Sequence, residues 1–144
     1  MAQHDNRPGK GLNLIVYPSN LVGASRVGKI AKSLQASGDF AETHAVGMGV
    51  PGEQLPAEEE LSPGVKVKRV PIANWTFFGG WTLAQLRWPR SVVRKYRNRD
   101  VRVVSAQRAL VLPLVHRLSR KTGPVFAYNA HELETEVLGF SGLK

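Results

Sequence analysis

The sequence predicts an α/β fold class, a Rossmann-like parallel sheet flanked by helices. Short apolar runs alternate along the chain with segments in which apolar residues recur every three or four positions. The first run, residues 12–17, is almost continuously apolar, which is typical of a strand buried on both faces of a parallel sheet. The repeated order of strand and helix indicates right-handed βαβ units.

The first quarter of the chain is expected to hold a leader, a strand and a helix. Residues 1–11 are polar and contain Pro and Gly, so we expect a disordered leader and a folded domain over residues 12–144. After a loop at residues 18–24, an amphipathic helix is predicted, with Ser25 as its N-cap and Gly38 as its stop signal. Its apolar positions follow the spacing i, i+3, i+4 and i+7 and are Val27, Ile30, Ala31 and Leu34.

Two further strands and one long loop are predicted before the middle of the chain. Residues 42–48 favour a strand of the parallel sheet. Residues 47–64 are rich in proline and glutamate and predict a surface loop. Residues 65–68 alternate with a period of two and have a single apolar face, so we expect a peripheral strand there.

The last third of the chain predicts strand, helix and strand, followed by a titratable pair. Residues 101–105 are β-rich, and residues 111–118 carry a helical apolar stripe that stops before Gly123. Residues 125–128 form a short apolar strand that leads to His131 and Glu132. Ligands of open α/β sheets bind outside the carboxyl ends of the strands. We therefore expect this pair at the mouth of a site, where a helix should begin.

Composition limits the class of protein. A chain of 144 residues is long enough for one domain with a real core. It has no cysteine, so disulfides and thiolate zinc sites are excluded and a cytoplasmic location is the default expectation. The carboxylates and histidines lack metal-ligand spacing, so no metal is expected. No apolar run reaches the length of a spanning helix, which predicts a soluble or peripheral protein.

The net charge of +9 is concentrated in one segment. Residues 87–102 hold seven basic side chains against the single acid Asp100, a net charge of +6. Such a field attracts phosphate on nucleic acid, on lipid head groups or on a sugar nucleotide. The seven are Arg87, Arg90, Arg94, Lys95, Arg97, Arg99 and Arg102.

Aromatic side chains precede this basic segment. All three tryptophans and two phenylalanines lie within fourteen residues of one another. Aromatics beside cations are typical of segments that lie on anionic membranes, so docking at the inner membrane surface is one hypothesis. The alternatives are aromatics that pack on the sheet beside a solvated arginine face, or a module that binds single-stranded nucleic acid, although no nucleic-acid motif is present. The proposed patch comprises Trp75, Phe77, Phe78, Trp81, Arg87, Arg90, Arg94 and Lys95.

Several short motifs, in order, resemble one enzyme family. The strongest is Tyr-Asn-Ala-His-Glu-Leu at residues 128–133, and it is preceded by Pro-Ser-Asn at 18–20, Ser-Arg-Val at 25–27 and Leu-Pro-Leu at 112–114. Together they resemble the N-terminal half of the retaining glycosyltransferases of family four, which have the GT-B fold. The chain departs from the family at Asn129, where relatives usually carry Asp, and at residues 105–107, where they are histidine-rich.

The resemblance implies the acceptor-side half of an enzyme with two α/β domains. The complete enzyme would transfer a sugar from a nucleotide-sugar donor to a hydroxyl acceptor, such as a lipid-linked one or a polysaccharide precursor, with the anomeric configuration retained. The resemblance implies no cofactor besides this donor substrate and no metal-bound diphosphate. The C-terminal donor-binding domain is expected to lie outside these 144 residues, so the chain alone is expected to be inactive.

The resemblance also suggests roles for individual residues. It implies that His131 faces the donor sugar, with Glu132 either orienting the imidazole or capping the next helix. The loop with Ser19, Asn20 and Gly23 leads into a helix N-terminus, which favours an anion, and Arg26 adds a guanidinium that can hold phosphate. Each has a plainer interpretation: acids in a first helical turn, a turn glycine, and an arginine that lies along the sheet.

Overall fold

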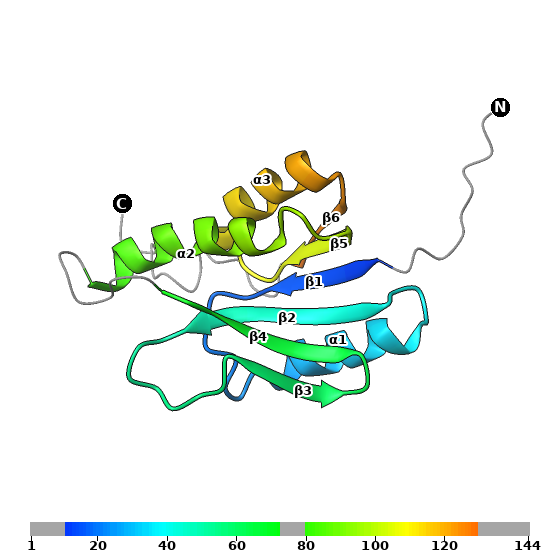
Figure 1. The fold of residues 1–144 in the computed structure, drawn as a ribbon, viewed down its shortest axis with the longest axis horizontal. Helices are drawn as coiled ribbons and strands as arrows, with labels where there is room; N and C mark the ends of the chain where they lie inside the picture. The colour runs from blue at the N-terminus through cyan, green and yellow to red at the C-terminus, as the bar shows by residue number, and fades with distance from the viewer. Residues whose placement is uncertain (1–10, 73–79, 130–144) are drawn as a thin grey trace, which may run out of the picture.

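The computed structural model describes residues 11–72 and 80–129 of the chain. In this part of the chain a six-stranded, mostly parallel sheet is flanked by three α-helices, which confirms the predicted α/β class (Figure 1). The elements in chain order are β1 (Leu12–Val16), α1 (Ser25–Ala36), β2 (Glu42–Gly49), β3 (Glu58–Ser62), β4 (Val65–Pro71), α2 (Gly80–Tyr96), β5 (Val101–Ala106), the 3-10 helix η1 (Ala109–Val111), α3 (Leu112–Thr122) and β6 (Val125–Tyr128).

The sheet is doubly wound around β1. Its strand order is β3-β4-β2-β1-β5-β6, and every pair is parallel except β3 with β4. From β1 the chain moves outward through β2 to the β3–β4 side, and after α2 it returns to the other side of β1 as β5. The strand order therefore reverses between β1 and β5, and such a reversal is where open α/β sheets bind ligands.

Each face of the sheet has its own apolar core. The helices α2 and α3 cover one face with Trp88 and Leu118, and α1 covers the other with Val27 and Ala31 (Figure 1). Strand β1 contributes to both cores because successive side chains of a strand point to opposite faces. All five of its residues are buried, as the continuous apolar run predicts.

The prediction of a surface loop at residues 47–64 is partly wrong. Strand β2 continues to Gly49, and Glu58–Ser62 forms β3, an antiparallel edge strand paired with β4. Three consecutive glutamates disfavour a strand on composition, but two of them lie near basic residues of β4. Glu58 forms an ion pair with Lys68, and Glu59 forms one with Arg69. Opposite charges on neighbouring strands stabilise the pairing.

Two smaller expectations also need correction. The strand predicted at residues 65–68 is not peripheral, because β4 lies between β2 and β3 and its one-sided apolar pattern reflects a single buried face. Ser25 is the first residue of α1 and not its N-cap; the cap position is Ala24, which makes no side-chain capping bond. The helix predicted at residues 111–118 is confirmed as α3, with a proline in its first turn.

Candidate functional site

The chain segments that leave β1, β5 and β6 meet at the reversal of strand order. The amide of Gln107 donates to the carbonyl of Val16 at 3.1 Å, and the amide of Asn129 donates to that of Ala106 at 2.9 Å. The guanidinium of Arg108 lies 5.7 Å from the centre of the Tyr17 ring, within cation–π range. These contacts hold the three exits side by side at the carboxyl edge of the sheet.

The loop after β1 is shaped by its own side chains. Ser19 Oγ accepts a bond from the amide of Leu21 at 3.1 Å, and Asn20 Oδ1 accepts one from the amide of Val22 at 3.0 Å. Asn20 Nδ2 also donates to both carboxylate oxygens of Glu53, at 3.0 and 3.2 Å. Ser19 and Asn20, predicted to bind phosphate, are therefore engaged in forming the loop.

The same loop passes very close to β2. A Cβ atom on Gly47 would lie 2.6 Å from the carbonyl oxygen of Ser19, so this strand position requires glycine. The loop then turns through Leu21, whose φ of 63° is unusual for a residue with a side chain. Backbone strain of this kind gathers at ligand-binding loops, which is compatible with a functional role.

The first turn of α1 has backbone donors that no side chain caps. Gly23 precedes it in an exposed left-handed conformation, with φ of 69° and nothing within 4 Å of the place that a Cβ atom would take. The first turn contains no acidic residue, and Arg26 is exposed. Free N–H groups at the positive end of the helix dipole favour an anion. Gly23 and Arg26 therefore lie at an uncapped, exposed helix start, and their binding of phosphate stays a prediction.

Arg69 is a residue that sequence reasoning missed. Its side chain is buried, and its guanidinium donates to the carbonyl of Asn20 at 2.9 Å, to the carbonyl of Pro56 at 2.9 Å and to Glu59 at 3.1 Å. It thereby joins the loop after β1, the loop after β2 and strand β3. The alternating pattern of residues 65–68 points to the strand but does not indicate that the next residue is a buried cation.

A second polar cluster lies at the opposite end of the sheet. His44 Nε2 lies 2.9 Å from Glu42, and His44 Nδ1 lies 3.2 Å from the hydroxyl of Tyr96. Lys66 Nζ completes the cluster, 2.8 Å from the other oxygen of Glu42. The cluster ties β2 to β4 and α2. Because Glu42 and His44 begin β2, it lies away from the carboxyl edge, and we assign it a structural role.

The pKa values of this cluster follow from its contacts. The hydrogen bonds from Lys66 and then from His44 lower the pKa of Glu42 to about 2. Burial lowers the pKa of His44, although Glu42 opposes this shift. Burial also raises the pKa of Tyr96. At neutral pH the cluster therefore holds a carboxylate, a neutral imidazole and a neutral phenol.

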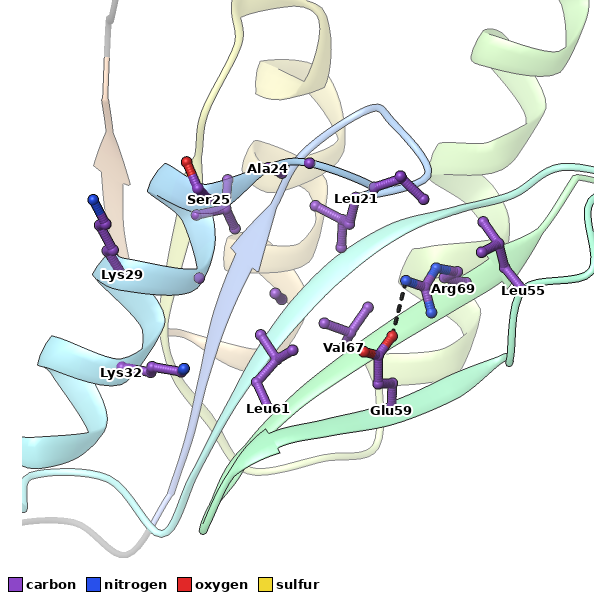
Figure 2. A pocket seen from close by; sticks show the side chains of 15 residues that line it. Leu21, Ala24, Ser25, Lys29, Lys32, Leu55, Glu59, Leu61, Val67 and Arg69 are labelled. Atoms are coloured by element: carbon purple, nitrogen blue, oxygen red, sulfur yellow. Dashed lines mark hydrogen bonds and ion pairs between the residues drawn. The ribbon is translucent and has the colours of Figure 1, made fainter.

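A cavity of about 600 Å³ lies on the α1 side of the sheet (Figure 2). Its walls are the loop after β1, one side of α1, strands β2, β3 and β4, and Leu55 of the loop after β2. Figure 2 shows the Arg69–Glu59 ion pair on the β4 and β3 side and Lys29 and Lys32 on the α1 side. Sequence reasoning did not predict this cavity, because its walls come from segments far apart in the chain.

The helix α2 divides clearly into a buried and an exposed side. Trp88 and Tyr96 are 1% and 2% exposed, and Val92 and Val93 are buried with them. Trp88, which is not part of the proposed membrane patch, therefore belongs to the core, as the alternative of aromatics that pack on the sheet expects. No acidic residue occurs on this helix. Its basic residues are all exposed, and they are Arg87, Arg90, Arg94 and Lys95.

Several predicted site residues lie outside the described residues. These are the pair His131 and Glu132 and the aromatics Trp75, Phe77 and Phe78, together with the side chain of Trp81. Within residues 11–72 and 80–129, no group of three or more acidic or histidine side chains could hold a metal ion. The helices of this part are all too short or too polar to cross a bilayer.

Neither the comparison with protein-family models nor the search of curated proteins found a match for this chain. The proposed function therefore rests on the residues and on their arrangement.

Proposed function

We propose that this chain is the acceptor-side domain of a retaining glycosyltransferase built from two α/β domains. The observation that carries the proposal is the meeting of the exits of β1, β5 and β6 at the reversal of strand order. Ligands of doubly wound sheets bind at this place. The exit of β6 leads through Asn129 to the Ala-His-Glu segment, which resembles the sugar-transferring site of the family.

In this proposal the segment after β6 contacts the donor sugar, and the loop after β1 binds a phosphate group. The imidazole of His131 would hydrogen-bond a hydroxyl of the donor sugar or stabilise the positive charge that develops as the glycosidic bond to the diphosphate breaks. Glu132 would orient that imidazole. The free amides at the start of α1, with Gly23 and Arg26, would hold a phosphate group. Ser19 and Asn20 would act by shaping this loop, since their side chains already have partners within or beside it.

The donor would be a nucleotide sugar and the acceptor a hydroxyl compound. A second domain would bind the nucleotide, and the reaction would take place in the cleft between the domains. The chemistry needs no cofactor, because the leaving nucleoside diphosphate supplies the driving force for transfer. The chain of 144 residues alone would bind phosphate weakly and would not turn over.

The test is a transfer assay with a panel of nucleotide sugars and hydroxyl acceptors. A form of the protein that includes the donor-binding domain should form a glycoside, and its anomeric configuration should match that of the donor. The 144-residue chain should give no product under the same conditions. Absence of transfer with every donor, or an inverted product, would reject the proposal.

We further propose that α2 brings the domain to an anionic membrane surface. The exposed arginines of α2 lie away from the buried side with Trp88 and Tyr96, so they can face a surface without disturbing the core. No acid on the helix competes for them. A peripheral position at the inner membrane would suit an enzyme with a lipid-linked acceptor. Retention on anionic vesicles, compared between the parent chain and variants of these arginines, tests this proposal.

A further inference from the structure

We propose that the cavity beside α1 binds a single-chain amphiphile with an anionic head group. This site goes beyond the sugar-transfer proposal, because it needs neither His131 nor a second domain, and it shares only Gly23, the loop after β1 and the start of α1 with the proposed phosphate site. Its volume of about 600 Å³ falls within the range of roughly 300–1,000 Å³ that is typical of small-molecule sites.

The walls of the cavity favour an apolar chain. They carry aliphatic side chains from several elements, among them Leu21 of the loop after β1, Val27 of α1, and Leu61 and Val67 of β3 and β4. Val22, also in the wall, is 61% exposed, and a ligand would cover this large apolar side chain. An apolar chain that lies against these side chains would be partly removed from water.

The charges around the cavity favour an anionic head group. Among the described residues that line it, the one acid is Glu59, which lies 3.1 Å from Arg69, so these two charges offset each other. Lys29 and Lys32 remain, and none of the ion pairs found in the described part of the chain involves either of them. The described wall therefore has an excess of two positive charges, both on α1.

The position of these lysines separates head group from chain. Figure 2 shows Lys32 directed from α1 toward the Leu61 side of the cavity, whereas Lys29, one turn nearer Ser25, extends from the outer side of α1. Lysine has a flexible stem, so either ammonium group can follow a carboxylate or a phosphate at the opening. The structure thus fits a ligand whose head lies at α1 and whose chain lies against β3 and β4.

Isothermal titration of the 144-residue chain with dodecanoate and with dodecyl phosphate tests this assignment. Saturable binding of one molecule per chain is expected for at least one of them, and the comparison between them identifies the preferred head group. The neutral dodecyl maltoside and the cationic dodecyltrimethylammonium ion should bind much more weakly. Equal binding of the neutral amphiphile, or no binding of either anion, would overturn the proposal.

Matched variants locate the site. A Cβ atom at Gly28 would lie 3.7 Å from Leu61, an ordinary contact, so Gly28→Leu fills the cavity from a helix position where leucine is favoured. This variant should lose binding, whereas Ser33→Leu, exposed on the same helix and outside the cavity wall, should retain it. Thermal melting shows that each variant is folded. Undiminished binding by Gly28→Leu would contradict the location.

A second pair of variants tests the head-group contact without altering the cavity shape. The double variant Lys29→Gln/Lys32→Gln should weaken dodecanoate binding by about tenfold, as the loss of a charge-assisted contact implies. The control Arg117→Gln/Arg120→Gln removes two exposed charges from α3, outside the cavity wall, and should leave the affinity unchanged. Arg26 belongs to the proposed phosphate site, so a loss of binding only in Arg26→Gln would assign the amphiphile to that loop and reject the cavity.

Discussion

The two sides of this molecule use charge in opposite ways. On the β2–β4–β3 side, charged residues of the strands are joined in pairs: Arg69 with Glu59, Lys68 with Glu58, and Lys66 with Glu42. On α2, the four basic residues are exposed and have no acid beside them on the helix. The first side uses its charges to hold strands and loops together, while α2 directs them outward.

We interpret this difference as one between a structural role of the paired charges and the membrane-binding role that we propose for α2. A buried charge must be paired, and removing one partner leaves the other groups without a bond, so substitutions there should cost stability. An exposed charge contributes little to folding, and a cluster of like charges is tolerated because water and counterions screen it. Substitution of α2 arginines should therefore affect binding and spare the fold.

The largest effect on stability is expected at Arg69. Arg69→Met keeps the length of the side chain but leaves the carbonyls of Asn20 and Pro56 without their donor. We expect the free energy of unfolding to fall by about 3 kcal/mol, measured by urea denaturation. The matched substitution Arg90→Met, on exposed α2, should change it by less than about 0.5 kcal/mol. Similar losses in both variants would remove the distinction between the two sides.

A smaller, pH-dependent effect is expected at His44. Burial lowers the pKa of His44 in the folded protein below its ordinary value of 6.5, so the unfolded chain binds this proton more readily. The stability that neutral His44 provides is present above pH 6.5 and is lost as the pH falls from there toward the folded pKa. Charged neighbours at this site are Glu42, which favours the imidazolium, and Lys68 and Arg99, which oppose it.

Two comparisons isolate this effect. His44→Gln should be less stable at neutral pH but should lose less stability than the parent chain as the solution is made mildly acidic. His116→Gln, at an exposed position of α3, should keep the parent dependence. Glu42 contributes in a separate window, because its pKa of about 2 lies below its ordinary value of 4.5 and its stabilisation is lost only as the pH falls between these values. A parent-like profile in His44→Gln would contradict the assignment.

The smallest effect on stability, with a large effect on binding, is expected on α2. The triple variant Arg87→Gln/Arg90→Gln/Arg94→Gln should melt like the parent but lose salt-sensitive retention on phosphatidylcholine vesicles that contain phosphatidylglycerol. The control Arg26→Gln/Lys29→Gln/Lys32→Gln removes the same number of charges from α1 and should still be retained. Equal loss in both triple variants would show an effect of net charge alone. Binding of a single-stranded oligonucleotide in place of vesicles would favour nucleic acid as the partner.

The parts of the fold that depend on local pattern were predictable. The apolar run at residues 12–17 identified β1, because burial on both faces leaves a continuous signal in the sequence. The apolar stripe and the proline identified α3. Strand β3 was missed because its glutamates resemble a loop until Lys68 and Arg69 of β4 are placed beside them. Pairing across strands is a property of the fold and leaves no periodic signal.

The candidate sites, too, depend on contacts between distant segments, which the sequence pattern does not reveal. The spacing of loop and helix after β1 indicated a turn at Gly23 and an arginine at the start of α1, but it did not show that Ser19 and Asn20 use their side chains to form the loop itself. The cavity beside α1 depends on residues between Leu21 and Arg69 that meet only in the folded chain. Short-range residue order therefore suggested where ligands could bind, and long-range packing determined which side chains are available for it.

The proposed sugar transfer at the carboxyl edge of this sheet depends above all on His131. In a form of the protein that includes the donor-binding domain, His131→Ala should lower kcat by about 10²–10³-fold, the usual cost of losing a transition-state hydrogen bond. Its melting temperature should match that of the parent, and His116→Ala, changed at an exposed histidine of α3, should keep full turnover. Undiminished turnover in His131→Ala, or a loss that only follows the loss of folded protein, would contradict the proposed role of His131.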